Sequence, residues 1–254
     1  MIIIELAYSF HLGSDKNKRN ASRSSAKYNR SGSTSLSNNA IQNSAGLTKV
    51  DKHNYRKYDN NQNDIEIIKG SSSLVDDVKK LYKEEFDEAK EEYNLKQARD
   101  DRKIKDNFTH ISNNEKNDLA CEIIIELGDK NYWDTKDDKF KRRMTNVYKK
   151  QNEDLEIILP TFKIASAIIH YDETSPLLHI VGVPIKFNNK NGMKKQVGKS
   201  DVFTKESLGK LQDKMRTLCI ESFNKEYNLT NTLKGKKKGR NHDYHITEMD
   251  NYLE

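Results

Sequence analysis

Cysteine is scarce in this sequence: only Cys121 and Cys219 occur in 254 residues. They are far apart, and their spacing fits neither a zinc ribbon nor a disulfide framework, so both kinds of site are excluded. We expect two buried thiols in a reducing compartment, which predicts a cytoplasmic protein.

Long hydrophobic runs are also absent. No apolar stretch approaches the roughly 18 residues that a membrane-spanning helix needs. The apolar start "MIIIELAYSF" lacks a basic region and a small-residue cleavage site, so it predicts a first strand and not a signal peptide. No P-loop sequence is present, so an ATP site of that kind is not predicted. Hydrophobic residues make up 34% of the chain and charged residues 33%, which indicates a modest core.

Acidic residues are rare near both ends of the chain. Residues 11–57 contain ten lysines and arginines against two acids, and residues 234–240 contain five basic residues and no acid. Residues 13–46 have no apolar period, so we expect 11–57 to be a mobile basic loop and 234–254 a basic tail. Two separate basic segments in a chain of net charge +6 favour a nucleic acid as partner.

The apolar patterns predict an α+β fold, an antiparallel sheet covered by helices, in a single domain over 1–254. A long helix over 73–98 carries its apolar side chains at steps of three and four. The sheet and a hairpin are expected within 120–228. The strands are expected at 1–10, 120–128, 162–173 and 177–185, and further helices from about 137 and after Thr204.

The hairpin "HYDETSPLLHI" (170–180) is a candidate metal site. His170 ends one predicted strand, His179 lies on the next, and Glu173 lies in the turn between them. Two imidazoles and a carboxylate suit a transition ion such as Mn²⁺ better than Mg²⁺. Asp172 is a candidate hydrogen-bond acceptor that fixes the tautomer of a histidine ligand, or a cap of the turn. A core histidine at position 179 and a surface histidine at 170 would explain the same pattern.

The tetrapeptide "HNYR" (53–56) is a second candidate. His53 is a possible nucleophile, and the guanidinium of Arg56 could clamp a phosphate. A polar turn explains the tetrapeptide equally well.

Taken together, "HNYR" and "HYDETSPLLH" resemble two motifs of the MobV, or Pre/Mob, relaxases, which are plasmid mobilisation and recombination enzymes. The family's first motif is His-Asn-x-Arg and its third is His-x-Asp-Glu-x-x-Pro-His-x-His. "EIIIELGDKNYW" (122–133) and the segments "IVGVPI" and "FTKESLGKLQ" after the hairpin also resemble the family. Leu177 stands where the family has the middle histidine, so this chain departs from the pattern at one expected metal ligand.

The resemblance implies an HUH-endonuclease-like relaxase domain that nicks and rejoins one DNA strand at the transfer origin of a mobile element. His53 would form a covalent 5′-phosphohistidine intermediate, Arg56 would hold a phosphate, and His170, His179 and Glu173 would bind Mn²⁺, with Mg²⁺ possible. Glu173 would alternatively orient the nucleophile. The tyrosines Tyr55 and Tyr58 are rival nucleophiles, with Tyr58 the principal alternative.

The partners implied are the hairpin and single strand of the transfer origin, together with a second copy joined through a C-terminal region that this chain lacks. The residues expected to bind DNA are Lys49, Lys52, Arg56, Lys57, Lys236, Lys237, Lys238 and Arg240. Two alternatives stay open at this point. One is a module that binds origin DNA with reduced or lost nicking because of Leu177, and the other is a metal-dependent hydrolase of small phosphoesters.

Overall fold

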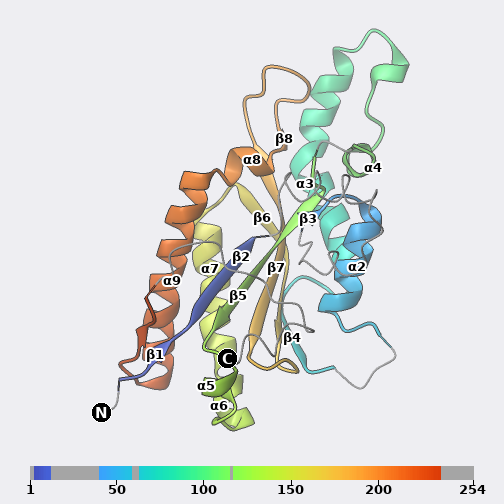
Figure 1. Ribbon diagram of the computed structural model, residues 1–254. Helices are drawn as coiled ribbons and strands as arrows, with labels where there is room; N and C mark the ends of the chain where they lie inside the picture. The colour runs from blue at the N-terminus through green and yellow to red at the C-terminus, as the bar shows by residue number, and fades with distance from the viewer. Residues whose placement is uncertain (1–2, 13–39, 59–62, 115–116, 236–254) are drawn as a thin grey trace, which may run out of the picture.

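The computed structural model describes residues 3–12, 40–58, 63–114 and 117–235 (Figure 1). The segments of the predicted basic loop at 13–39 and of the predicted tail at 236–254 lie outside these residues. The charges counted there, including Lys236, Lys237, Lys238 and Arg240, therefore have no structural description.

Apolar strands from the middle of the chain form the centre of an antiparallel sheet with the order β2–β5–β7–β6–β4. The strands of this path are β2 (Tyr8–Leu12), β4 (Ile65–Lys69), β5 (Ala120–Leu127), β6 (Phe162–His170) and β7 (Leu177–Lys186). Two short strands extend it, because β3 (Ala40–Ile41) pairs with β5 and β8 (Gln196–Val197) pairs with β7. A separate parallel pair joins β1 (Glu5–Leu6) to β9 (Thr232–Leu233).

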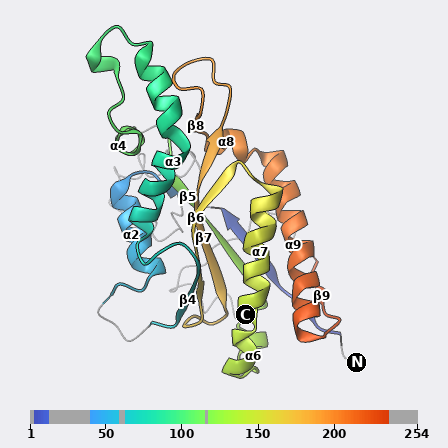
Figure 2. The same cartoon turned by 180° about the vertical axis from the view of Figure 1, so that it is seen from behind.

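Helices cover both faces of this sheet (Figures 1 and 2). One face packs against α7 (Met144–Ile158) and α9 (Lys205–Tyr227), and the opposite face packs against α2 (Ser44–Asn54) and α3 (Leu74–Leu95). Shorter helices lie between these elements: η1 (Asp100–Arg102), α4 (Asn107–Ser112), α5 (Lys130–Trp133), α6 (Asp138–Arg142) and α8 (Lys199–Val202).

The two faces follow from the alternation of side chains along β7. Leu178 and Ile180 are buried in the core beneath α7 and α9, whereas Val181 belongs to the core beneath α2 and α3. His179 alternates with Leu178 and Ile180, so it points to the face that α2 covers. This parity decides on which side of the sheet a site at the hairpin lies.

The predicted α+β fold is confirmed, with an antiparallel sheet covered by helices. The helix predicted over 73–98 is α3, and its N-cap Ser73 accepts a hydrogen bond from the Asp76 amide. The helix predicted from about 137 is divided into α6 and α7. Cys121 and Cys219 are both buried and free, as expected. Among the described residues, no helix is long and apolar enough to cross a membrane.

One expectation is wrong, and one strand was not predicted. The last part of the predicted loop 11–57 is helix α2, which begins after Asn43, whose side chain accepts from the Gly46 amide at 2.9 Å. Only Leu47 is a fully buried apolar residue in this helix, so its sequence has almost no apolar period to reveal it. Strand β4, which pairs with β6 at the edge of the sheet, was not expected either, because it follows a run of polar residues.

Candidate metal and nucleophile site

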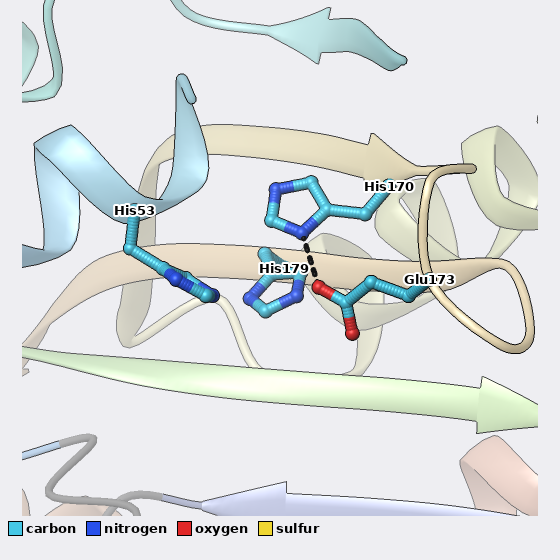
Figure 3. A group of neighbouring side chains, drawn as sticks. All are labelled: His53, His170, Glu173 and His179. Carbon is cyan, nitrogen blue, oxygen red and sulfur yellow. Dashed lines mark hydrogen bonds and ion pairs between the residues drawn. The ribbon is translucent and has the colours of Figure 1, made fainter. Parts of the chain in front are cut away.

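His53, His170, Glu173 and His179 converge from four elements of the fold (Figure 3). His53 lies in the last turn of α2, His170 ends β6, Glu173 lies in the hairpin turn, and His179 lies on β7. One ligand atom of each residue lies within 4.8 Å of the ligand atoms of the other three. The hairpin and the "HNYR" tetrapeptide, whose nearest histidines His53 and His170 are 117 residues apart, therefore form one site.

The strand register explains how the two hairpin histidines meet. His170 pairs directly with Leu177 across β6 and β7, and His179 lies two residues further along β7. Directly opposed residues of antiparallel strands share a face, and so do residues two apart. Both imidazoles therefore point to the α2 side, and their ring centroids are 4.1 Å apart.

The side chain of His179 is fixed by a buried carboxylate. Its Nδ1 lies 2.9 Å from Oε1 of Glu122 on the neighbouring strand β5. With the proton on Nδ1, the lone pair of Nε2 points into the cluster, and this buried nitrogen has no hydrogen-bond partner among the described residues. A carboxylate behind a histidine whose other nitrogen is vacant is the usual environment of a metal-ligating imidazole.

Glu122 stays ionised despite its burial. Burial alone would raise the pKa of this carboxyl, but the hydrogen bonds from His179 and from the side chain of Asn54 outweigh it and lower the pKa. A negative charge at this place strengthens the basicity of the histidine that donates to it.

His170 has an acceptor at each of its ring nitrogens. Nε2 lies 2.9 Å from the main-chain oxygen of Asn54, and Nδ1 lies 3.0 Å from Oε1 of Glu173. Burial lowers the pKa of His170, which favours the neutral ring with one proton. The neutral ring donates from one nitrogen at a time. With the proton on Nδ1 it donates to Glu173, and with the proton on Nε2 it donates to Asn54 and leaves the Nδ1 lone pair available to a cation that Glu173 also binds. Together with the vacant nitrogen of His179, this arrangement fits a bound divalent metal.

Arg56 connects the helix to the hairpin turn. It follows α2 with a left-handed backbone (φ 50°) and donates to both oxygens of Asp172, at 2.8 and 2.7 Å, and to Glu173 at 2.6 Å. Burial would raise the pKa of Glu173, but the hydrogen bonds from His170 and Arg56 prevail and lower its pKa to about 2. Glu173 is therefore a carboxylate at neutral pH and a suitable metal ligand.

The other predicted site residues lie around this cluster. Asp172 was expected to accept a hydrogen bond from a histidine, but it accepts from Arg56. Glu122 is the carboxylate that faces a histidine nitrogen, Nδ1 of His179. Arg56 was expected to bind a phosphate. Its hydrogen bonds to Asp172 and Glu173 occupy the guanidinium in this structure, so phosphate binding stays a prediction. Tyr58 is 48% exposed, whereas the hydroxyl of Tyr55 lies 3.0 Å from Ser166 in the core. Of the basic residues expected to bind DNA, Lys49 and Lys52 are exposed on α2 and Lys57 pairs with Asp51.

Sequence analysis missed Glu122 and Asn54. Glu122 lies within the apolar strand "ACEIIIEL", and a charged residue in such a strand is itself a signal, because a buried carboxylate needs a partner. Asn54 is the second residue of "HNYR" and binds both sides of the site: its side chain donates to Glu122, and its main-chain oxygen faces His170. No pattern in the sequence indicates these contacts.

Leu177 faces the same side of the sheet as the two hairpin histidines, directly opposite His170 on β6 and Glu126 on β5. A leucine offers no donor atom, so this position adds nothing to the cluster. The carboxylate of Glu126 does not replace it, because it is hydrogen-bonded to Ser9 and Ser175 and lies outside the group of four.

The fold and the site together define an α+β protein whose antiparallel sheet carries two histidines and a carboxylate that could hold a metal ion, facing a helix-borne histidine. The model of the plasmid recombination enzyme family Mob_Pre matches residues 38–249, and the chain belongs to this family. The match includes the whole cluster.

Solved structures share this fold. One is the MobM relaxase domain bound to plasmid pMV158 oriT DNA of 22 nucleotides, an Mn-bound crystal structure at pH 5.5. It is 18% identical, with a TM-score of 0.52 over 84% of this chain and 95% of that chain. A second Mn-bound structure of the same domain, with a 3′-thiophosphate DNA at pH 6.8, is 17% identical, with a TM-score of 0.51 over 84% and 96% of the two chains. At this identity the likeness shows the fold. A search of the curated proteins gave no match.

The position of Leu177 leads to a first prediction. In Leu177→His, an added imidazole faces His170 on the site side of the sheet, so it is expected to ligate and to tighten Mn²⁺ binding about tenfold or more, about 1.4 kcal/mol. Isothermal titration calorimetry measures the change. Leu177→Ala, which alters packing without adding a donor, is the control and should not tighten binding. Equal affinities in all three proteins would show that position 177 does not face the ion.

Proposed function

We propose that this chain is a relaxase domain that nicks and rejoins one DNA strand at the transfer origin of a mobile element. The observation that carries the proposal is the convergence of His53 with His170, Glu173 and His179 in a member of the plasmid recombination enzyme family. The MobM domains of the same fold were crystallised with oriT DNA and manganese, which supports the same substrate and metal here.

His53 is the proposed nucleophile. Partial removal of this imidazole from water lowers its pKa, and the nearby His179 and Arg56 lower it further, so the ring is neutral and offers a lone pair at neutral pH. Its attack forms an N–P bond to the scissile phosphate while the bond to the 3′ oxygen breaks. The 5′ end stays attached to the protein, and reversal of the step rejoins the strand without ATP.

His170, Glu173 and His179 are the proposed ligands of a divalent ion, Mn²⁺ in preference to Mg²⁺. When bound, this ion would polarise the non-bridging oxygens of the phosphate. Glu122 orients His179 through its Nδ1, and Asn54 holds the end of α2 against β5 and β6 through its contacts with Glu122 and His170. Arg56 holds Glu173 in place and, when DNA enters, is the candidate to exchange one of its carboxylate contacts for a phosphate.

The alternative suggested by Leu177, a DNA-binding module without nicking, is not favoured. Four donors converge despite the leucine, and the nitrogen of His179 that would bind a metal is left vacant. A role in the cytoplasm, where plasmid DNA is processed, is part of the proposal.

The decisive experiment is a covalent-attachment assay. The protein is incubated with Mn²⁺ and a single-stranded oligonucleotide that carries the origin of its own element, labelled at the 3′ end. We expect a labelled species that survives denaturing electrophoresis and disappears without the metal. DNA that is bound specifically but never attached would contradict the nicking function and favour the binding module.

The basic segments provide a second prediction, which tests DNA binding without cleavage. Replacing Lys236, Lys237 and Lys238 with Gln is expected to weaken binding to origin and scrambled DNA alike, because phosphate contacts carry no sequence information. A plot of log K against log salt should become shallower by about two units, since each contact contributes roughly 0.7 to 0.9. The slope is measured by fluorescence anisotropy.

A matched control removes the same charge elsewhere. Lys205, Lys210 and Lys214 are exposed on α9, the helix that covers the face of the sheet opposite the site. Their replacement with Gln should leave the slope unchanged. If both triple variants behave alike, the C-terminal lysines do not contact DNA specifically.

A further inference from the structure

His53 lies close enough to the other three donors to be a ligand itself. Its ring centroid is 5.6 Å from those of His170 and His179, and the four donor atoms lie within 4.8 Å of one another. Metal–nitrogen bonds of roughly 2.1 Å put two ligands of one ion at most about 4.2 Å apart. A side-chain movement of less than an ångström would therefore bring all four atoms into one coordination sphere.

The main chain next to His53 is held against the face of the sheet that carries His170 and His179. The next residue, Asn54, is buried and joined to Glu122 on β5 through its side chain and to His170 on β6 through its main-chain oxygen. Both partners belong to the site, because His170 is a proposed ligand and Glu122 orients the ligand His179. His53 thus projects toward the cluster from a main chain that is held by hydrogen bonds to Glu122 and His170 (Figure 3).

The remaining donors leave room for another ligand. His170, Glu173 and His179 supply three donor atoms, and Leu177 on the same face supplies none. Manganese and its neighbours take at least four ligands. In the group of four, His53 is the one member that the fold leaves exposed, so it is also the one that an incoming ligand can reach and replace.

We propose that His53 is a ligand of the metal in the DNA-free protein and becomes the nucleophile only when an oxygen of the scissile phosphate displaces it. A nitrogen lone pair bound to the ion cannot attack phosphorus, so the coordinated state is inactive. Entry of the phosphate exchanges one ligand for another and frees His53 beside the atom that it attacks. The switch rests on the proposed nicking function, whereas coordination by His53 does not.

Metal binding without DNA tests the coordination. By calorimetry, His53→Ala is expected to weaken Mn²⁺ binding at least tenfold. His110→Ala, which removes an exposed histidine on α4 away from the cluster, should have no effect. In a Leu177→His background a new donor compensates, so adding His53→Ala should cost less than threefold. An unchanged affinity in the His53→Ala protein would overturn the proposal.

Pulsed electron paramagnetic resonance of bound Mn²⁺ counts the coordinated histidine nitrogens directly. We expect three in the unmodified protein and two in His53→Ala. Addition of an origin oligonucleotide with a methylene group in place of the bridging 3′ oxygen should reduce three to two in the unmodified protein. A count of two before DNA is added would overturn coordination by His53, and a count of three that persists with bound DNA would overturn the exchange. Three nitrogens in a protein that does not bind DNA would support the coordination and contradict the proposed function.

Discussion

The His53→Ala protein is expected to form no covalent adduct with origin DNA while still binding that DNA within a few-fold of the unmodified protein. The substitution removes the proposed nucleophile and leaves the exposed lysines of α2 in place. Adduct yield is measured by denaturing electrophoresis and DNA affinity by anisotropy at one salt concentration. In the unmodified protein the linkage should be acid-labile and stable in base, as a phosphoramidate is.

Tyr58→Phe is the matched control, because this exposed tyrosine follows His53 by five residues and is the rival nucleophile. Its adduct yield should equal that of the unmodified protein. A full yield from His53→Ala together with a loss in Tyr58→Phe would reverse the assignment and predict an acid-stable tyrosine phosphodiester in place of the acid-labile linkage.

Glu122→Gln is expected to weaken Mn²⁺ binding about 10- to 100-fold, the range usual for loss of a carboxylate behind a metal-ligating histidine. The glutamine keeps the shape and one acceptor oxygen, so the loss reports the missing charge at His179 and not a cavity. Calorimetry gives the affinity, and thermal unfolding of the metal-free protein shows whether the fold persists.

Glu126→Gln provides the comparison, since Glu126 lies on the same strand and the same face as Glu122 but outside the group of four donors. It should change the affinity for Mn²⁺ less than threefold. Equal effects of the two substitutions would mean that general electrostatics, and not the contact between Glu122 and His179, governs the site.

The parts of the fold that the sequence predicts well are those with a strong period. The hairpin of β6 and β7 is apolar and has its turn at "DETSP", so both its strands and the convergence of His170 with His179 follow from alternation alone. Helix α3 follows from its buried stripe of Val78, Tyr82 and Phe86. In these elements local pattern and tertiary packing agree.

The parts that could not be predicted depend on contacts between distant segments. Helix α2 has little apolar surface, and its place on the sheet is set by buried polar groups, Asn54 and Asp51, the latter accepting from the Leu74 amide. Arg56 was expected to await a phosphate because its ion pair with Asp172, 116 residues away, is invisible in the sequence. The motif resemblance supplied the grouping of His53 with the hairpin, which no periodicity contains.

The attachment of α2 through Asn54 and Arg56 also determines how this region moves. A helix of eleven residues is marginal by itself in water, so the last turn of α2 persists because it is joined to β5, β6 and the hairpin turn. We therefore expect the end of α2 to unfold together with β5 and β6, so that the free energy of local opening there is close to the free energy of global unfolding. Hydrogen exchange should find the amides of Asn54 and Tyr55 as slow as those of the central strands, whereas the exposed start of α2 exchanges faster. The main chain that carries His53 is therefore positioned by the sheet, before any ligand is bound.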